Sequence, residues 1–277
     1  MDGGRGMDLN TVTELARPRS RDEFAEWNDD AAWLAGSTWL FSEPQPHLRR
    51  LIDLAGLGWG DLEAGARGLR IGATCTLARL AGADWPADWR AGTLVGQCCG
   101  ALLGSFKIAG AATVGGNLCL ALPIAPMAAL LTALDGTCRI WTPAGGERRL
   151  PAVAFVIGPQ RNALRRGEVL RAVDLPADAL RRRTAFRRTS LTPLGRSAAL
   201  VIGTLAPDGA FALTVTASTP RPVRLDFPAP PGEAVLAARL DEEIPPTLYH
   251  DDVHGAPDWR RHVTRLLAED IRREIAA

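Results

Sequence analysis

Upstream of Pro176, apolar residues gather in short runs separated by turn-forming positions. Runs of this length, bounded by Gly, Pro, Asp or Ser, are typical of strands and short helices in a mixed α and β domain. They predict strands at 31–34, 51–54 and 68–73, a helix opening at 76–80, a buried helix at 91–103 and an apolar helix at 126–134. Residues 20–23, Ser-Arg-Asp-Glu, form a capping-box pattern that predicts a first helix through Trp27.

The pattern changes near Pro176. Two apolar runs at 198–205 and 211–216 predict strands, because a Pro-Asp-Gly turn at 207–209 separates them. A Pro-rich link at 228–231 leads to an amphipathic helix whose apolar residues recur at helical spacing and should face the core: Trp259, Val263, Leu266, Leu267 and Ile271. We therefore divide the chain into residues 1–175, an α/β part, and residues 176–277, a smaller α+β part.

Composition narrows the classes of function. The 277 residues are 47% hydrophobic and 23% charged with a net charge of +1, so nothing in the overall charge recruits nucleic acid or an anionic membrane. Lys107 is the only lysine, and the arginines do not interleave with aromatic residues as RNA binding would require. No apolar run approaches the ~20 residues of a membrane span, and the first ten residues do not resemble a signal peptide.

The cysteines favour a structural role. No two of them form a Cys-x-x-Cys pair, which argues against zinc or iron–sulfur ligation in this chain. An odd number in a chain that can build a core indicates reduced thiols and predicts a cytoplasmic protein. The five positions are Cys75, Cys98, Cys99, Cys119 and Cys138.

Common catalytic motifs are missing from the sequence. It contains no Gly-x-Gly-x-x-Gly, no P-loop, no Gly-x-Ser-x-Gly and no histidine pair with zinc spacing. Hydrolase and metal-enzyme functions therefore have little support.

Two glycine-bearing loops remain, each following an apolar segment. They are Leu34-Ala35-Gly36-Ser37-Thr38-Trp39-Leu40 and Ala112-Thr113-Val114-Gly115-Gly116-Asn117-Leu118. Such loops can present consecutive backbone N–H groups to an anion, because residues without bulk let phosphate oxygens approach. Taken alone, each is more often simply a turn.

With their surroundings, the two loops resemble the FAD-binding subunits of molybdenum hydroxylases of the xanthine dehydrogenase and carbon monoxide dehydrogenase family. That family has an Ala-Gly-Gly-Thr-Asp-Leu loop and a Thr-(Ile/Val)-Gly-Gly-Asn loop. The similarity is collinear over nearly the whole chain and extends to six further segments, at 51–54, 71–80, 167–176, 185–187, 220–224 and 251–275.

The resemblance implies an α+β fold: a two-lobed FAD-binding domain of the vanillyl-alcohol-oxidase/PCMH type over residues 1–175, then a small domain of an antiparallel sheet and helices over 176–277. It implies FAD in this chain, and molybdopterin and [2Fe–2S] clusters only in partner subunits. The partners would be a molybdopterin-binding large subunit and a [2Fe–2S] small subunit, in a dimer of heterotrimers. The chain would relay electrons from the clusters to an external acceptor.

The resemblance also implies the residues that contact FAD. Both loops would wrap the pyrophosphate and ribityl chain, Leu103 and Gly104 would make a small-residue contact, Leu170 would pack on the isoalloxazine ring, and Arg187 would lie near its polar edge. The loop residues are Leu34, Ala35, Gly36, Ser37, Thr38, Trp39 and Leu40 in the first, and Ala112, Thr113, Gly115, Gly116 and Asn117 in the second.

Four positions depart from the family pattern. Ser37 replaces a glycine, Trp39 an aspartate, Ala109-Gly110 an Arg-Asn pair, and Pro126 a carboxylate that would bond the cofactor. Each lost hydrogen bond costs ~1–3 kcal/mol of binding. Two alternatives therefore stand beside the electron relay: a flavin-free structural or assembly subunit with the same fold, and a free-standing flavoenzyme. The absence of a cluster of titratable residues in the sequence counts against the second.

Overall fold

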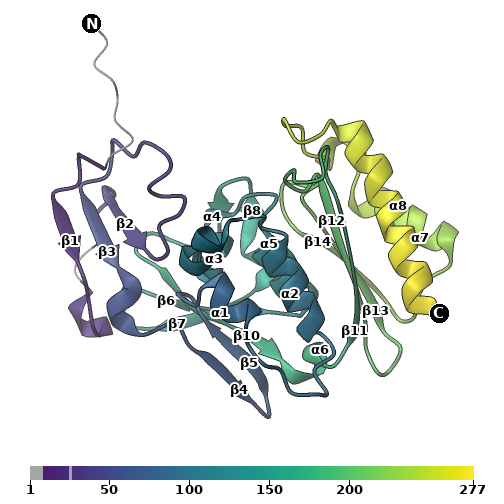
Figure 1. Cartoon of the computed structure of the whole chain (residues 1–277), viewed down its shortest axis with the longest axis horizontal. Helices are drawn as coiled ribbons and strands as arrows, with labels where there is room; N and C mark the ends of the chain where they lie inside the picture. Colours follow the sequence, from purple (N-terminus) through teal and green to yellow (C-terminus); the bar gives the residue numbers. More distant parts are fainter. Residues whose placement is uncertain (1–8, 25–26) are drawn as a thin grey trace, which may run out of the picture.

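The computed structural model describes residues 9–24 and 27–277, and within them the strands form four sheets (Figure 1). Two of these sheets form the two lobes of an amino-terminal half, which also holds a small two-stranded sheet. The remaining sheet, of four strands, lies at the opposite end of the elongated molecule and carries the carboxy-terminal helices (Figure 1). The α+β class expected from the sequence is confirmed.

The amino-terminal lobe is built on a parallel sheet in the order β1-β3-β2. Its strands are β1 (Glu14–Ala16), β2 (Ala31–Leu34) and β3 (Arg50–Asp53), followed by the 3-10 helix η2 (Leu54–Leu57). Asp53 caps η2 by accepting from the N–H of Ala55 at 2.9 Å. The expected strands at 31–34 and 51–54 are confirmed.

The prediction of a helix from Ser20 through Trp27 is wrong over its first residues. A single 3-10 turn, η1 (Arg21–Glu23), forms instead, and the Ser20 side chain caps no backbone N–H. The Glu23 carboxylate accepts from the N–H of Arg19 at 2.9 Å, one residue before the position that a capping box uses. Residues 25 and 26, where the helix would continue, lie outside the described part.

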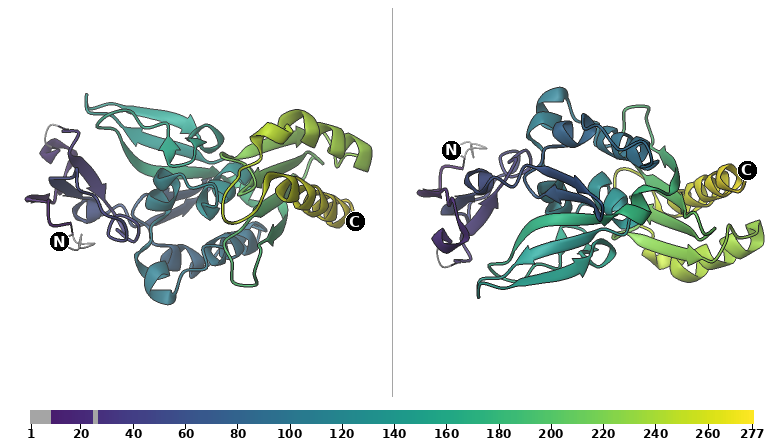
Figure 2. Two further views of the ribbon diagram at one scale, coloured as in Figure 1. Left: turned by 90° about the horizontal axis from the view of Figure 1, so that it is seen from above. Right: turned by 90° about the horizontal axis from the view of Figure 1, so that it is seen from below.

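The second lobe is an antiparallel sheet in the order β4-β5-β10-β6-β7, covered on one face by helices (Figure 2). The strands are β4 (Leu62–Gly65), β5 (Gly68–Gly72), β6 (Thr137–Trp141), β7 (Glu147–Pro151) and β10 (Val169–Pro176). The helices are α1 (Leu77–Ala81), α2 (Gly92–Gly100), α3 (Phe106–Ala111), α4 (Val114–Leu120) and α5 (Pro126–Ala133). Smaller elements are η3 (Ala152–Ala154), β8 (Val156–Gly158), β9 (Arg161–Asn162) and α6 (Ala177–Leu180).

Helix α5 is the centre of the larger core, since every one of its residues is buried. The segment at 113–117, expected to be a glycine-rich turn, is instead the start of α4. The physical reason is capping: the Thr113 hydroxyl accepts from the N–H of Gly116 at 3.0 Å, which stabilises a helix despite two glycines in its first turn.

The carboxy-terminal domain is an antiparallel sheet in the order β11-β12-β13-β14 between α5 and two outer helices. Its elements are β11 (Arg183–Thr189), β12 (Ala199–Leu205), β13 (Phe211–Thr216), β14 (Val223–Phe227), α7 (Glu233–Glu243), η4 (Pro246–Leu248) and α8 (Pro257–Ala276). Side chains alternate across the strands: Leu200 and Ile202 join the larger core, whereas Val201 faces a separate core under α7 and α8. The last strand of the five-stranded sheet, β10, ends at Pro176, and the first strand of the four-stranded sheet, β11, begins at Arg183.

The buried face of the C-terminal helix matches the expected one only in part. Ile271 is buried and Leu267 packs against the core as expected, whereas Leu266 is 53% exposed and the buried side chains include Arg260. The Arg260 guanidinium is fully buried and donates to the carbonyls of Gly255 (2.8 Å), Ala198 (3.0 Å) and Ala217, and it pairs with Asp252. An apolar spacing pattern cannot anticipate this anchor, which fixes how the helix is turned.

Arg260→Ala should lower the free energy of unfolding by ~3–5 kcal/mol, because it leaves a partly buried carboxylate and three carbonyls without their donor. Urea denaturation followed by circular dichroism measures this. Arg239→Ala is the control: among the described residues its guanidinium pairs with Glu242 and Glu243 on the surface of α7. A surface pair contributes at most ~1 kcal/mol, so equal losses in the two variants would contradict the anchor.

Candidate cofactor site

The two glycine-bearing loops meet across the boundary between the lobes. Gly36, in the loop after β2, lies against the end of α3, and a Cβ atom built on it would stand 1.8 Å from the carbonyl oxygen of Ala111 and 3.2 Å from the Cα of Ala112. Only glycine fits there, since real Cβ atoms do not approach a carbonyl oxygen so closely. The sequence-predicted segments are therefore brought together by direct backbone contact.

The first loop presents unused backbone donors. Ser37 has a φ of 61°, and the chain then turns tightly, with Phe41 N–H donating to Ser37 O at 3.0 Å and Ser42 N–H to Trp39 O at 2.9 Å. The N–H groups of Ser37, Thr38 and Trp39 donate to no acceptor within residues 9–24 and 27–277. Three successive free N–H groups in a tight turn can bind an anion.

The second loop does not present free donors, which corrects the expectation from sequence. Val114 N–H donates to Cys75 O and Gly115 N–H to Ala73 O, both at 2.9 Å. Gly116 N–H goes to the Thr113 hydroxyl at 3.0 Å and Asn117 N–H to Thr113 O at 2.9 Å. To a bound anion the second loop can therefore offer only open space and the weak positive end of the α4 dipole, because its backbone N–H groups are already paired.

Its two glycines have different reasons to be glycine. A Cβ on Gly115 would lie 2.6 Å from Ala73 O, so this buried residue is needed for packing against the end of β5. Gly116 is exposed, and a Cβ there would meet only the Thr113 hydroxyl, at 2.8 Å. Asn117 accepts from Met127 N–H at 3.1 Å and so caps α5 with its side-chain oxygen. Of the three, only Gly116 leaves space that a phosphate could enter.

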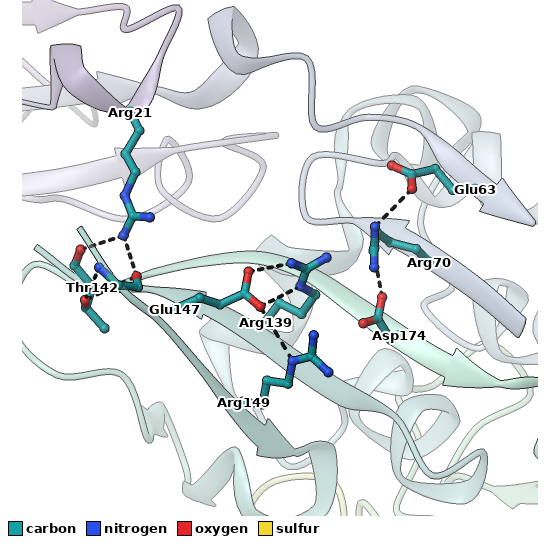
Figure 3. Close-up of polar contacts among 9 residues, drawn as sticks. Arg21, Glu63, Arg70, Arg139, Thr142, Glu147, Arg149 and Asp174 are labelled. Carbon is teal, nitrogen blue, oxygen red and sulfur yellow. Dashed lines mark hydrogen bonds and ion pairs between the residues drawn. The ribbon is translucent and has the colours of Figure 1, made fainter. Parts of the chain in front are cut away.

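Two arginines and two tryptophans form a continuous series of contacts at the boundary between the lobes. The Arg21 guanidinium lies 4.6 Å above the Trp141 ring, Trp141 meets Trp59 edge to face at 4.9 Å, and Arg171 lies 4.9 Å above Trp59. Figure 3 shows Arg21 reaching from the amino-terminal lobe to the turn at Thr142, whose carbonyl accepts from it at 2.9 Å. No local sequence pattern indicates these contacts, because Arg21 and Thr142 are 121 positions apart in the chain.

A buried carboxylate fixes the same boundary. Glu168 is 4% exposed and accepts from Arg148 Nε at 2.8 Å, Arg148 Nη2 at 2.6 Å and Arg165 N–H at 2.7 Å. The hydrogen bonds from Arg148 hold the pKa of the Glu168 carboxyl below its ordinary value. The backbone carbonyl of Glu168 accepts from the Trp33 indole at 3.0 Å. Trp33, one residue before the first loop, is thereby held against the second lobe.

The cysteines and acidic residues do not form a chemical centre. All five cysteines are free thiols, and burial raises the pKa of Cys75 to about 11 and those of Cys99 and Cys119 to about 12, so they are neutral at physiological pH. In the described part of the chain, no three His, Cys, Asp or Glu side chains are grouped to hold a metal ion. No helix described there is both long and apolar enough to cross a membrane.

A family profile described as the FAD binding domain in molybdopterin dehydrogenase matches residues 10–178. The chain belongs to this family. The match covers both lobes and both loops, so the resemblance noted in the sequence is confirmed.

Solved structures of the family show the same fold. A chain of quinoline 2-oxidoreductase from Pseudomonas putida 86 superposes with a TM-score of 0.74 at 20% identity, covering 94% of this chain and 95% of that one. Carbon monoxide dehydrogenases from Oligotropha carboxidovorans (TM-score 0.76, 20% identity, 94% and 97% covered) and Hydrogenophaga pseudoflava (0.75, 19%, 94% and 96%) agree. No curated protein matches the chain in sequence.

Four further residues that the family resemblance suggested lie outside the two loops. Leu103 and Gly104 join α2 to α3; Leu103 has a φ of 55° and is 39% exposed. Leu170 is 2% exposed inside the larger core, so a flavin could touch it only if the core opened. Arg187 pairs with Glu274 of α8 at 2.5 Å. Arg187 lies on the face of the sheet that α8 covers, because it alternates with Phe186, which faces the larger core on the other side.

Adjacent substitutions in the first loop should have opposite effects on stability. Gly36→Ala should cost at least ~2 kcal/mol, because the methyl group overlaps Ala111 O. Ser37→Gly should be neutral or stabilise by up to ~1 kcal/mol, since glycine adopts a positive φ without strain. Thermal and urea unfolding of both variants measure this, and a Gly36→Ala variant as stable as the wild type would mean that the loops do not touch.

Proposed function

We propose that this chain is the FAD-binding electron-transfer subunit of a molybdenum hydroxylase, taking electrons from the [2Fe–2S] clusters of a partner subunit and giving them to an external acceptor. The observation that carries the proposal is the first loop: three free N–H groups follow Gly36, whose backbone contacts Ala111 and Ala112 just ahead of α4. A pyrophosphate bound there would receive hydrogen bonds from one lobe and the positive end of a helix from the other. FAD, when bound, supplies the redox chemistry itself.

The residues of this chain would bind and orient the cofactor. Ser37, Thr38 and Trp39 would donate their backbone N–H groups, and the Thr38 hydroxyl adds a donor without adding charge. Leu103 and Gly104 would border the same space. Leu170 and Arg187 are not carried into the proposal, because one is enclosed in the core and the other faces α8.

The partners in this proposal are a molybdopterin-binding large subunit and a [2Fe–2S] small subunit, in a dimer of heterotrimers. A relay must lie within electron-tunnelling reach of a cluster, and the described residues include no cluster ligands. Beside the second loop, α3 exposes 82% of Phe106 and 39% of Ile108. Exposed apolar residues grouped next to a site are typical of a protein interface.

A second function, a flavin-free structural subunit, is favoured by specific observations. The backbone N–H groups of the second loop are paired within the chain, and Pro126 occupies the buried first turn of α5, where the family pattern has a carboxylate. Both reduce the number of hydrogen bonds that the chain can offer to FAD.

The relay and the structural function differ in flavin content. Purified complex should contain about one FAD per chain, bound non-covalently, and Gly116→Asp should weaken binding at least ~tenfold, since a carboxylate would occupy and repel the phosphate position. Absorbance after acid release measures the occupancy.

Gly232→Asp is the matched control, because Gly232 is also exposed and has open space around its Cβ position, but lies at the start of α7. Gly115→Asp is unsuitable, since it would clash with Ala73 and unfold the loop. Wild-type occupancy near zero would favour the flavin-free function, and full occupancy in Gly116→Asp would remove the second loop from the site.

The assembly prediction concerns Phe106. Phe106→Ser should leave folding intact, because the side chain is 82% exposed, but should reduce co-purification of the small subunit. Val253→Ser, at an 87% exposed position of the carboxy-terminal domain, should change neither. Affinity purification of co-expressed subunits with quantitative electrophoresis tests this. Undiminished recovery of the small subunit with Phe106→Ser would place the interface elsewhere.

A further inference from the structure

A cavity of about 400 Å³ lies between the amino-terminal lobe and the turn joining β6 to β7. Phe24, Trp27 and Trp33 line it on one side, with Arg21 and Asp22 near them and backbone with little side-chain bulk opposite. Small-molecule sites have volumes of this order. The residues that line the cavity, all in the described part of the chain, include none from the two loops.

Its aromatic wall is already in place. Phe24 and Trp27 lie with their ring centroids 5.4 and 4.8 Å from that of Trp33, tilted by 45° and 33°. The hydrogen bond from the Trp33 indole to Glu168 O fixes the central ring. A planar ligand could therefore stack on these rings without first ordering them.

The polar groups favour an uncharged ligand. The Arg21 guanidinium already donates to the carbonyls of Thr142 and Gly146 and lies over the Trp141 ring. The exposed Asp22 carboxylate has no hydrogen bond or ion pair with another described residue, so it can accept from an amino group. Among the described residues that line the cavity, Arg21 and Asp22 are the charged ones and have opposite signs, so this part of the lining prefers neither an anion nor a cation.

The opposite wall leaves room for a ring to enter. No atom lies within 4 Å of the position that a Cβ on Gly145 would take. On the inner side, a Cβ on Gly167 would meet Pro143 at 2.9 Å and Trp27 at 3.1 Å, so the lack of a side chain at Gly167 lets the wall close around the cavity.

We propose that this cavity binds a planar, uncharged heteroaromatic ring of purine size that carries an amino group. Two molecules present such a ring: a free nucleoside, and an FAD whose adenine extends from the first loop, which begins at the residue after Trp33. The second source rests on the proposed function; the first does not.

Adenosine is the probe, added to the full chain freed of flavin while tryptophan fluorescence is recorded. Saturable quenching is expected, and Trp27→Leu should weaken adenosine binding at least ~tenfold, the scale of losing one stacking partner. Trp85→Leu is the matched control, because Trp85 stacks on Trp89 instead of lining the cavity. No saturable quenching up to the solubility limit, or equal affinity in the Trp27 variant, overturns the proposal.

Competition identifies the source of the ring. If the adenine of FAD occupies the cavity, FAD displaces adenosine while FMN, which lacks adenine, does not. If the cavity is a separate nucleoside site, adenosine and FAD bind together. Flavin content of the same samples tests the proposed function by itself: adenosine binding that depends on Trp27 in a chain that never binds FAD overturns only the proposed function.

Discussion

The backbone contact between Gly36 and Ala111 determines how closely the two lobes of the amino-terminal half can approach. One lobe contributes a turn with unpaired amides, and the other contributes the start of a helix whose amides are already paired. The two parts meet at Gly36, a position where the chain has no side chain. The proposed anion site, which combines them, therefore depends on the contact between the lobes.

The far side of the same boundary is held by different forces. Trp33 is bonded to Glu168, and Arg21 and Arg171 lie over a pair of tryptophan rings. Cation–π contacts that are partly withdrawn from water are stronger than exposed ion pairs, and they tolerate small shifts better than close backbone packing does. The boundary thus combines one rigid contact at the loops with several adaptable ones behind them.

Elements with a strong local sequence pattern could be predicted, whereas elements whose position depends on residues far away in the chain could not. The strands at 31–34 and 68–73 and the helix at 126–134 were predicted because each is an apolar run in the sequence. Strand β7 was missed because three of its five residues are charged, so it forms no apolar run. The buried face of α8 was predicted only in part: Ile271 is buried as expected, but the buried Arg260, which no hydrophobic pattern reveals, is part of that face and Leu266 is not.

The same distinction between local patterns and distant partners applies to the candidate cofactor site. Family resemblance found both loops, but it could not show that the amides of the second loop are paired, since their acceptors, Ala73 and Cys75, lie some forty residues earlier in the chain. Nor could it place Arg187, because the face of a strand residue depends on where the strand begins.

The position of β10 in the second sheet has a consequence for biosynthesis. This strand lies between β5 and β6, and its Asp174 pairs with Arg70, 104 residues earlier. A ribosome adds ~5–20 residues per second, so the inner edge of β5 emerges and waits for several seconds without its neighbour. Unpaired strand edges recruit other chains, and a charged side chain on such an edge discourages that pairing. Arg70 is a charge of this kind on the edge that waits for β10, so the residue that pairs with Glu63 and Asp174 in the folded protein also disfavours pairing with another chain during synthesis.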